Sequence, residues 1–127
     1  MGGCGTFAAG NNVDFTYETV EFIEDAKVLV GIQGKGKHGL PEESHSPNAK
    51  YIKLENGVFK EIRVYNSKHQ VVLEIAYHRE GKLGSPQEPI LHYHTYKNGD
   101  FRTRTAAMLL PPDLLKQYKI YLRGVIL

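Results

Sequence analysis

Cysteine is almost absent from this sequence, in which Cys4 is the only cysteine among 127 residues. A single thiol cannot form a disulfide within the chain, and this is consistent with a reducing compartment. No apolar run approaches the roughly 18 residues that cross a membrane as a helix. The N-terminus also lacks the basic region and apolar core of a signal peptide. We therefore expect a cytoplasmic protein without a membrane partner.

An excess of charge of one sign is also missing, because the formal net charge is only +2. Dedicated nucleic-acid-binding proteins usually carry a denser basic surface, so the composition permits contact with nucleic acid without indicating it. Hydrophobic residues make up 41% and charged residues 24%, which excludes disordered and fibrous classes. The length predicts one domain. We expect a flexible glycine-rich arm over residues 1–12 and a single domain over residues 13–127.

The strongest structural signal is the Asn56-Gly57 pair between two alternating runs, residues 51–55 and 58–65. Both residues tolerate the positive φ that a tight hairpin turn requires, so this pattern predicts a β-hairpin. Two further apolar-rich runs, residues 70–78 and 90–96, predict two more strands.

The flanking segments complete the expected fold. Residues 16–23 fit a strand, although a short helix over 18–26 fits nearly as well, and residues 27–32 form a compact apolar strand candidate. Prolines at 111 and 112 precede an expected helix over 114–123, whose apolar side would cover the sheet. We therefore predict a single α+β domain, with a mostly antiparallel sheet of about four to six strands and a C-terminal helix packed on one face. The apolar residues of that helix are Leu114, Leu115, Tyr118 and Leu122.

Side chains alternate between the two faces of a strand, so the pairing of neighbouring strands decides which groups meet. We predict that Tyr65 lies opposite Gln70, which places Glu61 opposite Glu74 with Cβ atoms about 5 Å apart. This register gives a core face of apolar side chains: Ile62, Val64, Val71, Leu73, Ile75 and Tyr77. The other face, called the polar face below, carries ionisable side chains: Glu61, Arg63, Glu74, His78, His92 and His94.

Residues 33–48 form a long connection without a periodic pattern, and such connections in small domains are usually functional or disordered. In the functional interpretation Lys37 and His38 hold an anion, while Glu43 or His45 moves protons. In the other interpretation the segment is a solvated surface loop. The sequence favours neither.

The pair His92 and His94 permits metal chemistry, because residues two apart on a strand face the same direction. Zinc and iron sites use such a pair with a ligand from a neighbouring strand, here His78, Glu74 or Glu61. The spacing is weakly specific, however. We predict no metal and no cofactor, and keep a histidine-rich metal-binding small-molecule enzyme as an alternative.

The same inventory suits metal-independent cleavage of RNA. This reaction needs a base for the 2′-hydroxyl proton, an acid for the leaving oxygen and cations for the phosphate. His92 or His94 would be the base or acid, with Glu61 or Glu74 as its partner. The candidate phosphate clamp is Arg63, Lys37 or Arg102. The alternative is an ordinary cross-strand ion cluster with polar sheet histidines.

Several passages resemble a domain of Firmicute prophages that is often encoded with, or fused to, minor head proteins. They are GCGTFAAGNNV (3–13), KHGLPEESHS (37–46), RVY (63–65), LEIAYH (73–78) and LHYHTY (91–96). Some domains in that genomic position resemble polymorphic toxins, which include metal-independent RNases on a small α+β sheet. The resemblance implies a phage origin, and a phage protein or an immunity protein as partner.

We therefore predict a phage-derived domain that acts on RNA or another phosphate-bearing ligand, as a toxin-like, metal-independent ribonuclease. A non-enzymatic phage accessory or interaction module is the main alternative. The predicted catalytic residues are His92, His94, Glu61, Glu74 and His78. The predicted substrate-binding residues are Arg63, Lys37, His38, Glu43, His45 and Arg102.

Overall fold

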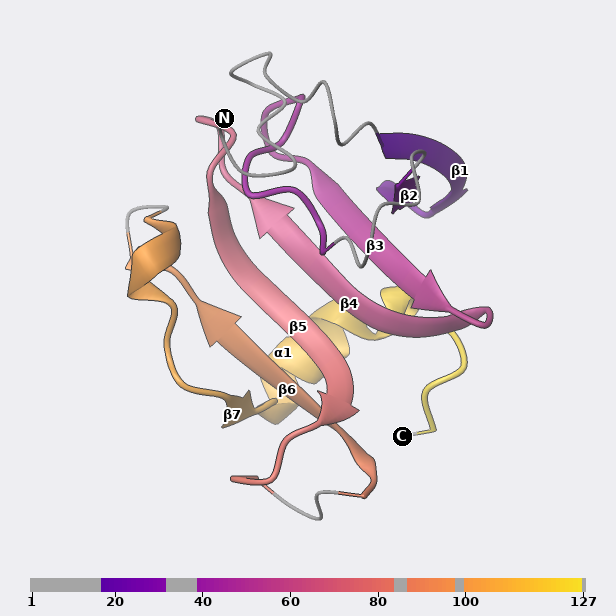
Figure 1. Ribbon diagram of the computed structural model, residues 1–127, viewed down its shortest axis with the longest axis vertical. Coiled ribbons are helices and arrows are strands. Elements are labelled where there is room, and N and C mark those ends of the chain that lie inside the picture. The colour runs from indigo at the N-terminus through magenta and orange to yellow at the C-terminus, as the bar shows by residue number, and fades with distance from the viewer. Residues whose placement is uncertain (1–16, 32–38, 84–86, 98–99, 127) are drawn as a thin grey trace.

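The computed structural model describes residues 17–31, 39–83, 87–97 and 100–126. The predicted arm over residues 1–12 lies outside these ranges. The described residues form one sheet of seven strands in the order of the sequence (Figure 1). The strands are β1 (Tyr17–Ile23), β2 (Ala26–Gly31), β3 (Lys50–Glu55), β4 (Val58–Tyr65), β5 (Val71–Arg79), β6 (Pro89–Thr95) and β7 (Met108–Leu109). The helices are η3 (Phe101–Thr103), α1 (Pro112–Tyr118) and η4 (Lys119–Tyr121).

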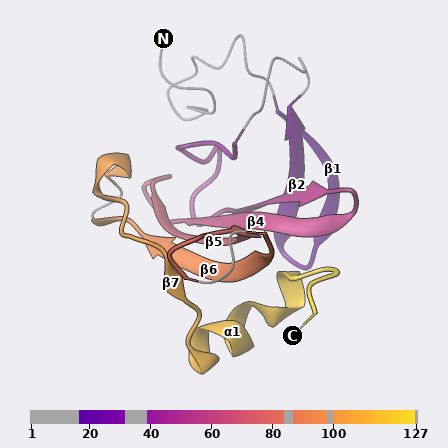
Figure 2. The ribbon, with the colours of Figure 1, turned by 60° about the horizontal axis from the view of Figure 1, so that its bottom comes forward.

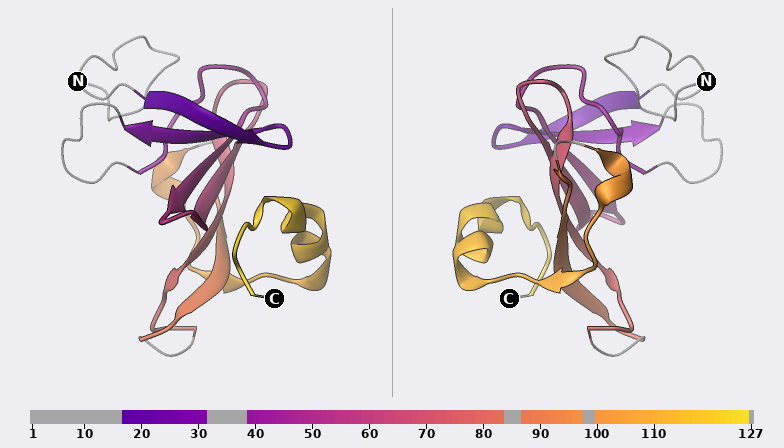
Figure 3. Two further views of the ribbon diagram at one scale, coloured as in Figure 1. Left: turned by 90° about the vertical axis from the view of Figure 1, so that its right-hand side faces the viewer. Right: turned by 90° about the vertical axis from the view of Figure 1, so that its left-hand side faces the viewer.

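All neighbouring strands are antiparallel except β2 and β3. The predicted mostly antiparallel sheet with a C-terminal helix is therefore confirmed, although the sheet has more strands than the four to six expected. Residues 17–23 form strand β1, so the alternative of a helix over 18–26 is wrong. Figure 3 shows the β1–β2 hairpin crossing over one end of the sheet, with the C-terminal helix beside one face. No helix in the described ranges is long and apolar enough to span a membrane.

The hairpin between β3 and β4 forms at the predicted turn. The φ angle is 53° at Asn56 and 81° at Gly57, which are the left-handed values that such a turn requires. A bulge follows at once, because Leu54 pairs with Phe59 whereas Lys53 pairs with Glu61. The extra residue in β4 rotates its start, so that Phe59 enters the core while Glu61 stays on the polar face.

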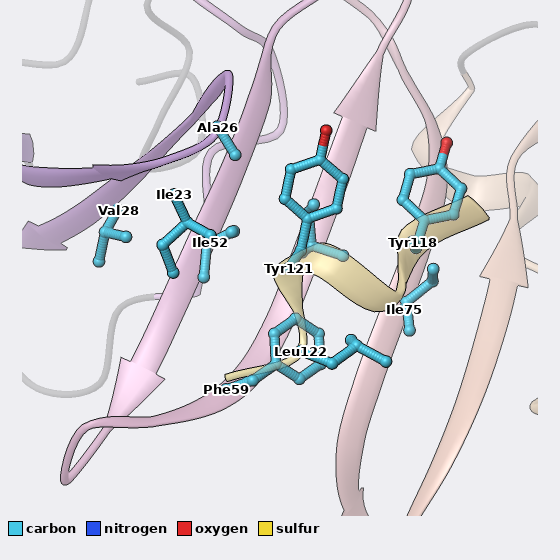
Figure 4. Packing of buried hydrophobic residues seen from close by; sticks show 10 residues of the cluster. Ile23, Ala26, Val28, Ile52, Phe59, Ile75, Tyr118, Tyr121 and Leu122 are labelled. Atoms are coloured by element: carbon cyan, nitrogen blue, oxygen red, sulfur yellow. The ribbon is translucent and has the colours of Figure 1, made fainter. Parts of the chain in front are cut away.

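The main core lies between the sheet and the C-terminal helix (Figures 2 and 4). Tyr118 and Leu122 point from the helical segment toward Phe59 and Ile75, as Figure 4 shows. The predicted apolar side of the helix is thus confirmed, although α1 ends at Tyr118 and continues as the short helix η4. Burial of each large apolar side chain contributes roughly 1.5–3 kcal/mol, so this packing holds the helix on the sheet. The buried cluster is Ile23, Ala26, Val28, Ile52, Phe59, Ile62, Ile75, Tyr118, Tyr121 and Leu122.

The predicted register of β4 and β5 is wrong, because Glu74 lies opposite Arg63 and Glu61 lies opposite Ala76. One step of the shift comes from the connection: it includes Gln70, whose backbone N–H donates to Asn66 Oδ1, so Tyr65 pairs with Val71. The second step is a bulge beside this pair. The two shifts of one residue add up to two residues, which is the period of side-chain direction along a strand. The same side chains therefore lie on the polar face as in the predicted register.

A second, smaller apolar cluster joins the sheet to the loop over residues 39–49, which runs above the sheet on the side away from the C-terminal helix (Figure 2). Val71 belongs to it, contrary to the prediction that Val71 faces the helix, because the bulge at Val72 turns Val71 and Leu73 to opposite faces. The loop above is held by the Ser44 N–H bond to the His69 carbonyl (2.9 Å) and by the Glu43–Gln70 bridge. The cluster is Leu29, Leu40, Tyr51, Tyr65, Val71 and Tyr96.

Candidate functional site

The polar face brings together the ionisable side chains that the strand pattern selected. One row across the sheet pairs Arg63 with Glu74 and Glu74 with His94. The next row pairs Glu61 with Ala76 and Ala76 with His92. The His78 ring lies edge-to-face with that of His92, with ring centroids 4.7 Å apart. All predicted residues of the polar face therefore share one surface, with a different pairing from the one expected.

Glu74 is the centre of a buried charge cluster and is only 2% exposed. Its Oε1 lies 3.4 Å from Arg63 Nε and accepts a 2.7 Å hydrogen bond from Tyr96 Oη. Its Oε2 lies 3.3 Å from Arg104 Nη2. Burial by itself would raise the pKa of Glu74, but Arg63, the Tyr96 hydrogen bond and Arg104 together hold it below the usual value. Because its charge is neutralised by Arg63 and Arg104, the Glu74 carboxylate is better suited to hold these two guanidinium groups in position than to transfer protons.

Tyr96 is buried beside this carboxylate and donates its hydroxyl proton to it. Burial and the adjacent Glu74 charge raise the pKa of Tyr96. The phenol therefore stays protonated at neutral pH and remains a hydrogen-bond donor.

His94 uses both of its ring nitrogens within the protein. Nδ1 lies 2.8 Å from the Thr105 carbonyl oxygen, which can only accept, so Nδ1 carries the proton. Nε2 lies 2.9 Å from Arg104 Nη2, and a guanidinium can only donate, so Nε2 accepts. Both ring nitrogens of His94 are thus engaged, so His94 has no nitrogen left for a ligand and serves to hold Arg104 in place.

His92 differs from His94 in the hydrogen bonding of one ring nitrogen, Nε2. Its Nδ1 donates to the Ile90 carbonyl oxygen at 2.8 Å, but its buried Nε2 has no hydrogen-bond partner among the described residues. Burial lowers the pKa of His92, and the neighbouring His78 and His94 rings act in the same direction, while the bond to Ile90 opposes the change only in part. The result is a neutral imidazole with a bare lone pair beside His78.

Arg63 joins the cluster to the loop above it. Its Nη1 donates to the Leu40 carbonyl and, at 3.3 Å, to the Pro41 carbonyl, and its side chain is 11% exposed. The Leu40 N–H points to Glu61 Oε1 at 3.5 Å. Arg63 therefore secures residues 40 and 41 over the polar face, and its predicted role as a phosphate clamp competes with these contacts.

Of the other predicted binding residues, the structure describes Arg102, Glu43 and His45. Arg102 is paired with Asp100 (3.2 Å) and its side chain is 90% exposed. Glu43 bridges to Gln70, and the exposed His45 donates its backbone N–H to Tyr51 Oη. Lys37 and His38 lie outside the described residues.

Two contributors to the site, Arg104 and Tyr96, escaped prediction. Arg104 follows the short helix η3, which begins at a turn and hides the alternation, so its direction could not be read from the sequence. The Thr105 N–H donates to the Thr95 carbonyl (3.0 Å) and thereby sets Arg104 beside β6. Tyr96 ends the alternating run of residues 90–96. The alternation shows that it shares the face of His94, but the sequence does not show that its hydroxyl group binds Glu74.

The histidine and carboxylate side chains of the polar face do not converge on a point where a metal ion could bind. Within the described ranges no group of three or more histidine, cysteine, aspartate or glutamate side chains could hold a metal ion. His94 illustrates the reason, since both of its nitrogens are engaged. The geometry therefore gives the metal-site alternative no support from these residues.

Comparison with known proteins adds no assignment. No family model, no curated protein and no solved structure matches the chain.

Proposed function

We propose that the polar face acts on RNA by metal-independent cleavage of the phosphodiester. The observation that carries the proposal is the bare Nε2 of His92 beside the His78 ring. A buried nitrogen without a partner costs roughly 1–3 kcal/mol, and His94 shows that the same sheet can satisfy both nitrogens of an imidazole. A lone pair left open next to a second imidazole suits proton transfer.

The proposed reaction uses His92 as base and His78 as acid. His92 Nε2 takes the proton of the 2′-hydroxyl, whose oxygen then attacks phosphorus. The bond from phosphorus to the 5′-oxygen breaks, and protonated His78 gives its proton to that oxygen. The products are a 2′,3′-cyclic phosphate and a 5′-hydroxyl. The His92 ring is 0% exposed, so we expect the His78 side chain to move when RNA binds.

Arg104 is the proposed phosphate-binding cation. Its side chain is 44% exposed, and Nη2 is held by Glu74 and His94. A guanidinium has five N–H donors, so several remain for a phosphate. Its position is fixed before the ligand arrives, which favours stabilisation of the charge that develops on the phosphate oxygens.

A gel assay of purified protein on mixed RNA, with and without EDTA, tests the proposal. We expect chelator-resistant cleavage that falls by about 100-fold or more in His92→Ala and in His78→Ala. His69→Ala is the matched control, because it removes a half-buried histidine of the β4–β5 connection, and its 2.7 Å bond to the Ser44 carbonyl, while leaving His92 and His78 in place. Cleavage that EDTA abolishes, or that persists in His92→Ala, would refute the assigned roles. No cleavage under any condition would refute the proposal itself.

A phage-encoded, toxin-like role in the cytoplasm is part of this proposal, as the sequence resemblance implies. An immunity protein that covers His78 would be a fitting partner for such a toxin.

A non-enzymatic interaction module is the second candidate, favoured by the edge strand β1. Val20 is 51% and Phe22 61% exposed there, and edge strands can pair with another chain. If RNA is not cleaved, affinity capture with wild-type protein and with Phe22→Ser would test this candidate. Equal capture by both would exclude β1 as the binding surface.

A further inference from the structure

A pocket of about 300 Å³ opens where strands β4 and β5 part. Their pairing ends at Glu61 and Ala76, although β4 begins at Val58 and β5 continues to Arg79. The bulge at Lys60 turns the start of β4 away, so the backbone of residues 77–79 that faces β4 has no partner strand there. The gap is lined by the starts of β4 and β6 and by the end of β5.

The charge around this pocket favours an anion. Lys60, His78 and Arg79 line it, and Glu55 is the only carboxylate among the lining residues. Glu55 lies 3.8 Å from Lys60 Nζ and is 62% exposed, so it neutralises this lysine only weakly. Arg79 is exposed and offers several N–H donors to a phosphate.

The rest of the lining is aromatic and apolar. Tyr77 contributes a half-buried ring and Phe59 a fully buried one. Aromatic rings provide stacking surfaces for nucleobases in proteins that bind single-stranded nucleic acid. The volume is at the lower end of the roughly 300–1,000 Å³ typical of ligand pockets, which suits one nucleotide rather than several.

We propose that this pocket binds one nucleotide of an RNA chain, with its base against Tyr77 and its phosphate held by Arg79 and Lys60. The inference rests on the proposed function for its link to cleavage. That link is His78, which lines the pocket and contacts the His92 ring. A nucleotide held in the pocket therefore contacts His78, the proposed acid of the cleavage reaction.

Binding of adenosine 5′-monophosphate and of inorganic phosphate, measured by calorimetry and by backbone amide NMR, tests the pocket directly. We expect the nucleotide to bind more tightly than phosphate and to shift the amides of residues 77–79. Arg79→Ala and Lys60→Ala should each weaken nucleotide binding about tenfold. Lys116→Ala, which replaces an exposed cation of α1, should leave it unchanged. Equal affinity for nucleotide and phosphate would reduce the pocket to an anion site and overturn the assignment.

The same variants separate this inference from the proposed cleavage. His92→Ala should lower cleavage by about 100-fold or more and keep nucleotide binding, because His92 does not line the pocket. Nucleotide binding that depends on Arg79, in a protein that cleaves no RNA, would support the pocket and refute the ribonuclease. Cleavage whose KM is unchanged in Arg79→Ala, with unchanged nucleotide affinity, would refute the pocket and leave the ribonuclease. An unchanged midpoint of thermal unfolding confirms that each variant is folded.

Discussion

Replacement of Glu74 by glutamine removes the one negative charge at the centre of the buried cluster. The change keeps the size of the side chain, and its amide oxygen can still accept the hydrogen bond from Tyr96. Arg63, however, is only 11% exposed, and its Nε lies 3.4 Å from the lost charge. Glu74→Gln therefore leaves a nearly buried guanidinium without its strongest counter-charge, which is one of the few changes that strongly destabilise a small domain.

The expected cost follows from the burial of the partners. Breaking a buried ion pair by removing one partner costs about 3–5 kcal/mol. Arg104 is 44% exposed and can be solvated again, so we expect a value near the lower end, about 3 kcal/mol. The control Tyr96→Phe removes one hydrogen bond to the carboxylate and should cost about 1.5 kcal/mol. We therefore expect Glu74→Gln to lower the free energy of unfolding by more than Tyr96→Phe does.

Urea unfolding at several pH values measures both effects. Because the pKa of Glu74 is lowered, the folded protein binds the proton of this carboxyl group less tightly than the unfolded chain does. A glutamate in the unfolded chain has a pKa of about 4.3. The stability that Glu74 provides is therefore complete above that value and is lost as the pH falls through the folded-state pKa. Glu74→Gln should lack this part of the acid destabilisation.

Two outcomes would refute this reasoning. A free energy of unfolding within about 0.5 kcal/mol of the wild type would mean that the cluster is not electrostatically coupled. An acid destabilisation between neutral pH and pH about 3 that is the same in Glu74→Gln and in wild type would mean that Glu74 does not titrate differently on folding.

Further predictions concern one cation and two glycines. Arg104→Ala should weaken RNA binding about tenfold by KM, whereas Arg123→Ala, equally 44% exposed and also ion-paired, should not; equal effects would remove Arg104 from the site. Gly124→Ala should cost more stability than Gly57→Ala, about 2 against about 1 kcal/mol in urea unfolding. Both glycines have φ near 80°, but only the new Cβ at residue 124 would meet Val58 Cγ2, at 3.2 Å, so equal costs would contradict the packing.

The alternation of apolar and polar residues was enough to predict which side chains share the polar face. Glu61, Arg63 and Glu74 lie together in the structure, as do His92 and His94. This works because the direction of a strand side chain repeats every second residue, whatever the partner strand. An error of an even number of residues in the register leaves the face intact, and the error made here was of that kind.

The pairing within the face could not be predicted, since it depends on a bulge and on the closure of one connection. The hydrogen bond from the Gln70 N–H to Asn66 extends the connection, and the bulge at Val72 adds the second step. Neither leaves a distinctive pattern in the sequence. The consequence for the site is large, because Glu74 faces a guanidinium instead of a second carboxylate.

The sequence by itself determined the four central strands, the Asn56-Gly57 hairpin and the composition of the polar face, because each depends on neighbours within a few residues. Tertiary structure alone decided which ring nitrogens have hydrogen-bond partners. Arg104 reaches Glu74 across 30 positions of the chain and occupies the second nitrogen of His94, while the same nitrogen of His92 is buried without a partner among the described residues. Such contacts are set by the packing of distant segments against one another, so local alternation carries no record of them.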